Sequence, residues 1–253
     1  AGHAVISNSS ALRMHKDVPL VIPEVNAGHL KVLECQSWRR HSGGFVVTNP
    51  NCSAIGLVMA LAPLEQHFGL EKVMAVTMQA VSGAGYPGVA SLDILGNVIP
   101  YIAKEEEKME EETRKLLGQR RDGHIELAHF RMSAQCNRVA VEDGHTESVS
   151  VELKKKAAGE EIIAVWKHFR SLPQELELPS APEHPLEYVS ASDRPQPRFD
   201  AERGAGMTAC VGRLRPCGVL DWKFTVLSHN TIRGAAGAAL LNAELLKAQG
   251  YLD

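Results

Sequence analysis

One cysteine lies in a sequence context that could make it a nucleophile. Cys52 follows Asn49-Pro50-Asn51 and precedes Ser53, where a short β-branched run ends and a helical pattern begins. The positive end of a helix favours thiolate over thiol, so we expect the pKa of this sulfur to be lowered without a neighbouring cation. The same residue also fits a structural role, because cysteine is often a small, buried, apolar side chain.

A second cluster of reactive side chains surrounds a turn signal at Asp143-Gly144. We interpret residues 135–154 as two strands joined there in a hairpin. Arg138 on the first strand offers a planar fork for a carboxylate, and His145 just after the turn could move a proton near neutral pH. Arg138 also fits a surface salt bridge, and His145 also fits a solvated turn residue.

Two further segments carry charged or small polar residues. Residues 100–117 form a strongly charged helical pattern, with Pro100 in the first turn and Gly118 as the stop. Its charges, Glu105 and Lys108 among them, fit a solvated helix face supported by i,i+4 pairs. Residues 8–13 offer small polar groups and Arg13, a set that suits either an oxyanion site or an ordinary loop.

Several predicted elements position these residues. Residues 4–6, 18–22 and 45–48 are short β-branched runs and predicted strands, and residues 72–80 are another. Residues 53–68 form a helical stripe that Pro63 should bend or shorten, which places Cys52 at the helix N-terminus. Residues 82–88 form a loop whose glycines let a ligand approach the backbone closely.

The second half of the chain continues this mixture of helices and strands. We predict a helix over 157–171, an irregular proline-rich segment over 172–200, strands over 210–227 broken at Pro216, and a helix over 233–249. Strands that alternate with helices indicate an α/β fold. The chain opens on a strand without a preceding turn or cap, and we therefore expect a domain that has been truncated at its start.

The composition excludes several classes of protein. The chain has 253 residues, of which 44% are hydrophobic and 23% charged, with a formal net charge of −3. These values are typical of a soluble protein with a substantial core, and they give no basic field for nucleic acid. The longest apolar run is too short to span a membrane. The five cysteines form no CxxC pair and no leader opens the chain, so we expect reduced thiols, no metal site and a cytoplasmic location.

Six segments resemble the aspartate-β-semialdehyde dehydrogenase family, in particular its fungal and archaeal branch. They are residues 6–14, 21–26, 49–53, 79–85, 136–145 and 230–236, in the family's order and over nearly the whole chain. The resemblance implies NADP-dependent reductive dephosphorylation of L-aspartyl 4-phosphate to L-aspartate 4-semialdehyde through a cysteine thioester. It further implies a place in the biosynthesis of lysine, threonine, methionine and isoleucine.

The resemblance also implies a role for each candidate residue. In the catalytic set, Cys52 would be the nucleophile and His145 the general acid/base. Gln79 would orient the reacting groups, and Asn51 would lie beside the nucleophile. The amino-acid part of the substrate would be held by Arg138 and Glu105, and phosphate by Arg13 and Lys108. The NADP edge would consist of Ser82, Gly83, Gly85 and Asn230.

The sequence departs from the family at its start. Family members open with a glycine-rich strand-turn-helix that cradles the NADP pyrophosphate, and no GxGxxG-type element precedes Ala4. We therefore expect the chain alone to bind NADP weakly or not at all, and to have little dehydrogenase turnover.

The expected fold is α/β in three parts. Residues 1–50 would be the remnant of a doubly wound Rossmann-type NADP-binding domain, and residues 51–227 an α+β catalytic and dimerisation domain with a mixed sheet. Residues 228–253 would form a C-terminal helix that packs back on the cofactor domain. The family implies a homodimer or homotetramer, and we expect its interface on a strand face lined by Val139, Val141, Val149 and Val151.

Three alternatives stay open. Another phosphorylating acyl-thioester dehydrogenase, acting on glyceraldehyde phosphate or acetylglutamyl phosphate, would share the Cys and His, although Arg138 and Glu105 favour an amino-acid substrate. A non-catalytic dimerising fragment would leave Cys52 no more reactive than Cys35 or Cys210. A cofactor-free thiol hydrolase or acyltransferase would need a third group that orients the histidine.

Overall fold

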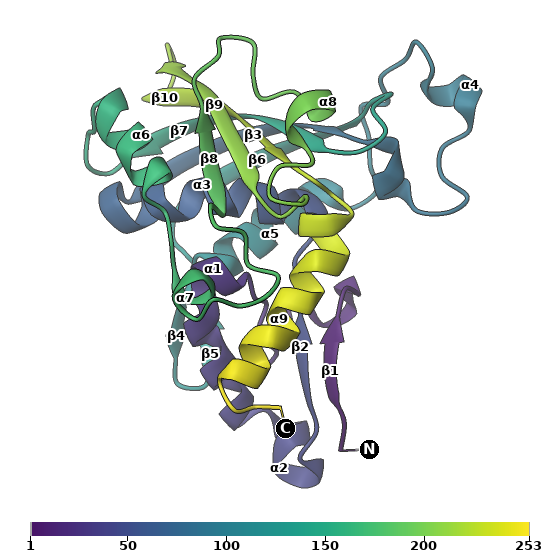
Figure 1. Ribbon diagram of the computed structural model, residues 1–253, viewed down its shortest axis with the longest axis vertical. Coiled ribbons are helices and arrows are strands. Elements are labelled where there is room, and N and C mark those ends of the chain that lie inside the picture. Colours follow the sequence, from purple (N-terminus) through teal and green to yellow (C-terminus); the bar gives the residue numbers. More distant parts are fainter. Residues whose placement is uncertain (1, 253) are drawn as a thin grey trace.

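The computed structural model describes residues 2–252, which form a broad upper layer around one large sheet and a narrower lower part (Figure 1). The strands are β1 (Ala4–Ser7), β2 (Phe45–Thr48), β3 (Leu70–Gln79), β4 (Gln119–Arg121), β5 (His124–Glu126), β6 (Arg131–Arg138), β7 (His145–Leu153), β8 (Leu186–Val189), β9 (Ala209–Pro216) and β10 (Trp222–Ser228). The α-helices are α1 (Pro23–Asn26), α2 (Ser37–Ser42), α3 (Cys52–Phe68), α4 (Ser91–Ile94), α5 (Glu105–Leu116), α6 (Gly159–Lys167), α7 (Leu172–Glu175), α8 (Pro197–Asp200) and α9 (Gly237–Ala248). The predicted α/β class, with a mixed sheet and a C-terminal helix, is confirmed.

The large sheet has the strand order β6-β3-β7-β10-β9-β8. β3 pairs in parallel with β6, and β8 with β9, whereas the other neighbours are antiparallel. Along β3, Val73 and Ala75 are buried while Met74 and Val76 are exposed. Since successive side chains of a strand point to opposite faces, one face of this sheet is covered and the other is open.

Helix α3 covers the middle of the sheet, with α5 beside it against β6 and α6 against β8. From Ser53 to Leu64 every residue of α3 is buried, as expected of a helix that is apolar all round. The helix does not end at Pro63 but continues to Phe68. The Trp166 indole N–H donates to the carbonyl oxygen of Ala60 (2.9 Å), which satisfies a polar group in the turn next to the proline.

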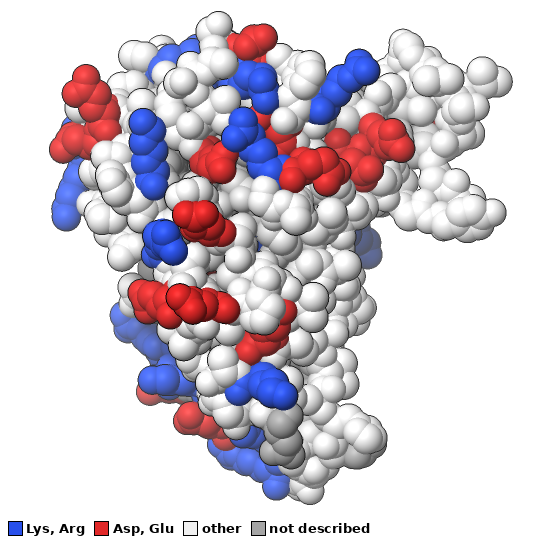
Figure 2. All heavy atoms as spheres, viewed as in Figure 1, with Lys and Arg blue, Asp and Glu red and all other residues white. Residues whose placement is uncertain are grey.

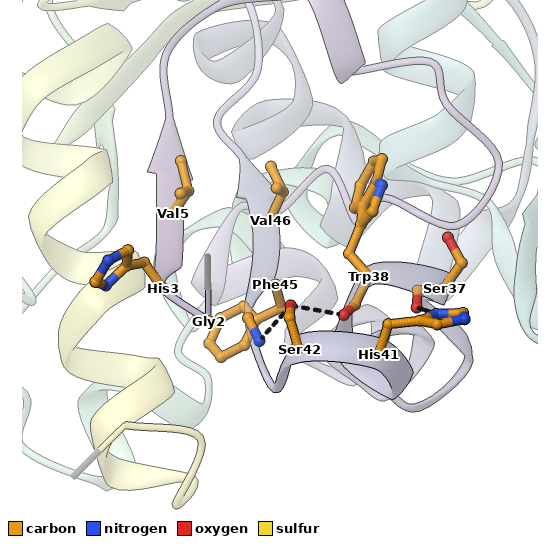
Figure 3. A pocket seen from close by; sticks show the side chains of 10 residues that line it. Gly2, His3, Val5, Ser37, Trp38, His41, Ser42, Phe45 and Val46 are labelled. Carbon is orange, nitrogen blue, oxygen red and sulfur yellow. Dashed lines mark hydrogen bonds between the residues drawn. The ribbon is translucent and has the colours of Figure 1, made fainter.

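The lower part contains segments from both ends of the described chain (Figure 1). β1 and β2 form a parallel pair, and α9 contacts β1 and α1. A second apolar cluster lies between them and includes Val21, Leu30, Val47, Leu241 and Leu245. The outer face of the pair is an open apolar hollow where Val5 and Val46 lie side by side and Trp38 of α2 closes one side (Figure 3).

The predicted hairpin over residues 135–154 is wrong. β6 and β7 are not neighbours, because β3 lies between them and pairs with both. The connection after β6 passes over the end of β3, where Val139 donates to the Gln79 carbonyl (3.0 Å) and Val81 donates to the Val141 carbonyl (2.8 Å). The Asp-Gly turn therefore ends a crossover instead of closing a hairpin.

Other boundaries also differ from the sequence expectations. Residues 18–22 make only one bridge, between Leu20 and Thr48, because Pro19 has no N–H to donate and Pro23 already begins α1. The charged helix begins at Glu105 instead of Pro100, since residue Ile99 pairs with β6. The segment 172–200 contains α7, β8 and α8, so it is less irregular than expected.

The prediction that a strand face lined by valines forms the subunit interface is also wrong in part. Val149 and Val151 are buried in the main core, on the side of the sheet that α3 covers. The open face instead carries the alternate residues of β3 and β7, among them Met74, Val76 and Ser148. A shift of one residue along a strand exchanges the two faces, so strand location alone does not decide which side is free.

Among the described residues, none of the helices has both the length and the apolar character required to cross a membrane.

Candidate active site

A cavity of about 600 Å³ opens where the start of α3, the loop after β3, the start of α5 and the segment before α9 meet. Eleven of the twelve predicted site residues line it: Arg13, Asn51, Cys52, Gln79, Ser82, Gly83, Gly85, Glu105, Lys108, Arg138 and Asn230. The twelfth, His145, is 1% exposed and contacts Cys52. Residues scattered from position 13 to position 230 are thus brought to one place.

Asn51 fixes where the nucleophile helix begins. Its side-chain oxygen accepts hydrogen bonds from the backbone N–H groups of Ser53 (2.9 Å) and Ala54 (3.2 Å), so Asn51 caps α3 and Cys52 is the first helical residue. The sequence predicts the position of Cys52 at the helix N-terminus, and the structure adds that Asn51 is the cap. The cap aims the first turn of the helix, and with it the sulfur, into the cavity.

The sulfur and the imidazole form a direct pair. Cys52 Sγ lies 3.3 Å from His145 Nε2. The backbone N–H of Ala80 donates to His145 Nδ1 (3.1 Å), so Nδ1 is an acceptor and the single proton of the neutral ring belongs to Nε2. His145 therefore presents an N–H to the sulfur and to any oxygen bound beside it.

Two glycines allow this pair to be enclosed. A Cβ on Gly83 would lie 2.9 Å from an Arg138 Nη1 and 2.9 Å from His145 Cε1. A Cβ on Gly234 would lie 2.7 Å from the Cβ of Cys52. Both backbones thus approach the reactive side chains more closely than any other residue type permits.

Burial keeps both reactive groups neutral in the free protein. Burial raises the pKa of the Cys52 thiol to about 12, and Glu105 adds to this, while Arg138 and Arg13 lower it. Burial lowers the pKa of His145 to about 3, with a smaller contribution from Arg138. The expected lowering of the thiol pKa is therefore wrong, because the loss of hydration outweighs the field at the helix start.

Glu105 organises the polar side chains on one wall of the cavity. Its carboxylate accepts from the amides of Asn51 (2.8 Å) and Gln79 (3.2 Å), and Lys108 Nζ lies 3.6 Å from it. It is 6% exposed, so it is not part of the solvated face that its helix suggested. On the same side Arg138 donates to the Ala80 carbonyl oxygen (2.8 Å), which leaves the rest of its guanidinium facing the cavity.

A buried glutamate that sequence reasoning missed connects Arg13 to the nucleophile turn. One Glu112 oxygen accepts from Arg13 (3.0 Å) and the other from the backbone N–H of Asn51 (2.6 Å). Burial raises the pKa of Glu112, and Arg13 opposes that rise. The spacing of Glu105, Lys108 and Glu112 on one helical face was a signal that could have found it.

The four residues predicted to border the NADP site lie together, but they do different things. The Asn230 side chain accepts from the Gly144 backbone N–H (2.8 Å) and donates to Ser82 Oγ (2.8 Å), so it supports the glycine loop. Gly85 has nothing within 4 Å of a Cβ position. The loop thus offers an open glycine edge on the cavity, which fits one end of a dinucleotide.

Comparisons with known proteins show the family of the chain. A sequence model described as "Semialdehyde dehydrogenase, dimerisation domain" matches residues 61–233, and one described as "Semialdehyde dehydrogenase, NAD binding domain" matches residues 1–33. The aspartate-semialdehyde dehydrogenase of Archaeoglobus fulgidus is 53% identical over 97% of this chain and 70% of its own length. That of Candida albicans is 43% identical over 100% of this chain and 73% of its own length.

Solved structures give the same result. The crystal structure of aspartate semialdehyde dehydrogenase with NADP from Candida albicans superposes with a TM-score of 0.90 at 41% identity, covering 99% of this chain and 73% of that one. The resemblance predicted from six sequence segments, fungal and archaeal branch included, is confirmed. The chain belongs to the aspartate-semialdehyde dehydrogenases, a family of oxidoreductases.

Proposed function

We propose that this chain carries the acyl-transfer site of an NADP-dependent enzyme that converts L-aspartyl 4-phosphate to L-aspartate 4-semialdehyde. The observation that carries the proposal is the enclosed Cys52–His145 pair, 3.3 Å apart, at the base of a cavity with cationic side chains on its walls. We further propose a cytoplasmic role in the biosynthesis of lysine, threonine, methionine and isoleucine.

In the first half of the reaction, Cys52 Sγ attacks the acyl carbon of the substrate. A carbon–sulfur bond forms, the carbon–oxygen bond to phosphate breaks, and phosphate leaves with the bonding electron pair. Arg13 and Lys108 border the cavity where the leaving phosphate would be held, and Arg13 is fixed there by Glu112. The thiol proton leaves with the phosphate, which departs as hydrogen phosphate, and Arg138 lowers the pKa of Cys52 in favour of that loss.

In the second half, bound NADPH would supply a hydride to the acyl carbon of the thioester; the carbon–sulfur bond then breaks, the semialdehyde leaves, and the Cys52 sulfur regains a proton from solvent. The chain's own contribution is the Nε2–H of His145, which points at the sulfur and stabilises negative charge on the neighbouring oxygen. Gln79 is held by Glu105 next to the same atoms. The α-carboxylate of the substrate would pair with the guanidinium of Arg138, which a point charge could not replace.

The cavity includes residues that fit one edge of a dinucleotide site. Ser82, Gly83 and Gly85 would contact one end of NADP, with Asn230 fixing Ser82. We expect the 253-residue chain by itself to bind NADP weakly, since its match to the NAD-binding family model covers residues 1–33. Titration calorimetry with NADP tests this expectation, and micromolar affinity of the chain alone would contradict it.

We propose the same division of the chain that the sequence suggested. Residues 1–50 would belong to the cofactor domain, 51–227 to the catalytic and dimerisation domain, and 228–253 to a helix that packs on the cofactor domain. Its support is the shared apolar cluster of β2 and α9, and the family match over residues 61–233. We also propose that the chain self-associates through the catalytic domain, as a homodimer or homotetramer.

The acyl-transfer half-reaction needs no NADP, so the chain can be tested as it is. We would incubate it with L-aspartyl 4-phosphate, quench with acid, and look for an aspartyl adduct on the Cys52 peptide by mass spectrometry, with phosphate release measured in parallel. Cys52→Ser should abolish both signals. Cys217→Ser, which removes a partly exposed thiol outside the cavity, is the control and should leave both unchanged.

The alternatives give different results in this assay. Absence of any adduct in the folded wild-type chain would favour a non-catalytic fragment. Adduct formation with acetylglutamyl phosphate in preference to aspartyl phosphate would favour the rival dehydrogenase. Continuous turnover of simple activated esters would favour a cofactor-free hydrolase.

A further inference from the structure

An ion pair that the proposed mechanism does not use lies entirely inside the molecule. On the face shown in Figure 2, charged side chains of both signs lie at the surface, where water solvates them. Arg233 and Glu24 are different, because both side chains are 0% exposed. Arg233 Nη1 donates to Glu24 Oε1 (2.7 Å), and its Nη2 donates to Met59 Sδ (3.0 Å). Removing two charges from water costs several kcal/mol per ion, so such a pair adds little net stability and points to a role in positioning.

The pair joins three segments that are distant in the sequence. Glu24 lies on α1, Met59 on α3 and Arg233 in the turn before α9. From that turn α9 runs from the upper layer to the lower part (Figure 1). The planar guanidinium therefore holds together the segment that we assign to the cofactor domain, the helix that begins at Cys52, and the C-terminal helix.

The turn that carries Arg233 is a π-helical turn, Ile232–Ala236. Such turns are rare, and they occur frequently at functional sites. Within this one, the Gly234 N–H donates to the carbonyl oxygen of His229, five residues earlier (2.9 Å). The wide turn brings the Gly234 backbone against the nucleophile, where a Cβ would lie 2.7 Å from the Cβ of Cys52.

Side-chain amides attach the same turn to the segment before the nucleophile. Asn49 Nδ2 donates to the carbonyl oxygen of Ala235 (3.3 Å), and Asn242 of α9 donates to Asn49 Oδ1 (2.6 Å). Asn49 and Asn242 are both fully buried. Since Asn49 lies two residues before the cap Asn51, the π-helical turn and the start of α3 are held together by these amides as well as by Arg233.

The π-helical turn also affects the state of the sulfur. Burial is the largest cause of the high pKa of the Cys52 thiol, about 12. The Gly234 backbone lies against the Cβ of Cys52, so the turn contributes to that burial. A turn that moved away would let water solvate the thiolate, which lowers the thiol pKa, and would no longer fix the direction in which the sulfur meets the substrate.

We propose that Arg233 is a positioning residue for acyl transfer, whose buried contacts with Glu24 and Met59 hold the π-helical turn over Cys52. The inference rests on the acyl-transfer function proposed above. Arg233 is 0% exposed, so it acts through the backbone of Gly234 and not by contact with the substrate. Because Glu24 belongs to residues 1–50, the same contact connects the part assigned to the cofactor domain with the nucleophile.

The test compares Arg233→Met with the double variant Arg233→Met/Glu24→Leu. The single variant leaves the Glu24 carboxylate buried without its cation and should be less stable, whereas the double variant removes both charges and should recover most of the stability to urea. In both variants, acylation of Cys52 by L-aspartyl 4-phosphate should slow at least about tenfold, because the sulfur is no longer held in place. Alkylation of Cys52 by iodoacetamide at pH 8 should become several-fold faster, because the sulfur gains water.

The opposite changes in the two rates distinguish positioning from a general loss of stability. The control is Leu153→Ala, which removes a buried side chain at the end of β7 far from His145. This variant should be less stable but should acylate and alkylate at the rates of the wild type. Mass spectrometry of the Cys52 peptide measures both rates.

The outcomes separate this proposal from the proposed function. A wild-type chain that forms no aspartyl adduct overturns the function, and the positioning role with it. If the wild type is acylated and the double variant is acylated equally fast, only the positioning role is overturned. Parallel losses in acylation and alkylation also overturn it. Should both variants fail to fold, Arg233→Lys, which keeps the charge but not the planar fork, decides by the same two rates.

Discussion

At the scale of single residues, the proton of His145 is set by the backbone and not by solution pH. The Ala80 N–H occupies the Nδ1 side, so a second ring proton would have to face another N–H. Burial, assisted by Arg138 and His229, lowers the pKa of the ring to about 3. His145 therefore serves as an Nε2–H donor over the whole neutral range.

The acylation rate should consequently show no inflection near pH 6.5 that belongs to His145. A histidine with an ordinary pKa would gain a proton below pH 6.5, whereas this ring stays neutral down to about pH 3. Single-turnover phosphate release from aspartyl phosphate, followed from pH 5 to 8, checks this. The prediction is wrong if a limb near pH 6.5 appears in the wild type and is missing in His145→Gln, a variant that should itself be slower by roughly 10²–10⁴-fold.

Gly83→Ala should impair acylation at least about tenfold, because its methyl group would overlap His145 and Arg138 and displace them from the sulfur. Gly28→Ala is the matched control, since a Cβ at Gly28 meets nothing within 4 Å. Adduct formation on Cys52 and the thermal unfolding temperature of both variants are the measurements. Equal acylation rates in the two folded variants would contradict the steric role of Gly83.

At the scale of elements, α5 contributes buried polar side chains as well as the exposed charges that its sequence pattern suggests. Glu107 and Glu111 are exposed, but Glu105, Glu112 and Lys115 are buried. Lys115 Nζ donates to the carbonyl oxygens of Arg13 (2.6 Å), His15 (2.8 Å) and Val18 (2.9 Å). The helix thus holds both the backbone and the guanidinium of Arg13 beside the nucleophile turn.

Glu112→Ala should destabilise the fold by roughly 2–4 kcal/mol, because it leaves the buried Arg13 guanidinium and the Asn51 N–H without their acceptor. Acylation should slow as well, since the turn that carries Cys52 loses a support. Glu111→Ala, an exposed neighbour on the same helix, should do neither. Urea unfolding and adduct formation measure the two effects, and equal stability of the two variants would contradict the assignment.

At the scale of the whole molecule, buried neutral histidines make stability depend on pH. His29 links the lower part to the end of α5: Asn26 Nδ2 donates to its Nδ1 (2.9 Å), and its Nε2 donates to the Gly118 carbonyl (3.1 Å). Burial lowers its pKa from 6.5 to about 4. Between those values the unfolded chain binds more protons than the folded chain, so acid favours unfolding.

The free energy of unfolding should therefore fall as the pH drops from 6.5 to 4, with His29 contributing about 3 kcal/mol of that loss. This contribution is fully present above pH 6.5. His29→Gln should be less stable at pH 7 but show a flatter decline, because the remaining acid sensitivity then comes from groups such as His145. Urea titrations at several pH values test this, and parallel slopes in wild type and variant would rule out the histidine.

The sequence by itself determined the parts that obey local rules. The helix start at Cys52 follows from hydrogen bonds within a few residues, and the glycine loop follows from permitted backbone angles. Ten of the twelve candidate residues lie in six short segments, each local, that resemble one family; Glu105 and Lys108 lie outside these segments.

Only the tertiary structure decided which strands are neighbours and what burial does to charge. A strong turn signal at Asp143-Gly144 predicted a hairpin, yet β3 inserts between β6 and β7, because strand pairing is settled by contacts far apart in the chain. The pKa of Cys52 rises where the helix start alone predicts a fall, since hydration is lost only when the loops at Gly83 and Gly234 close over the sulfur.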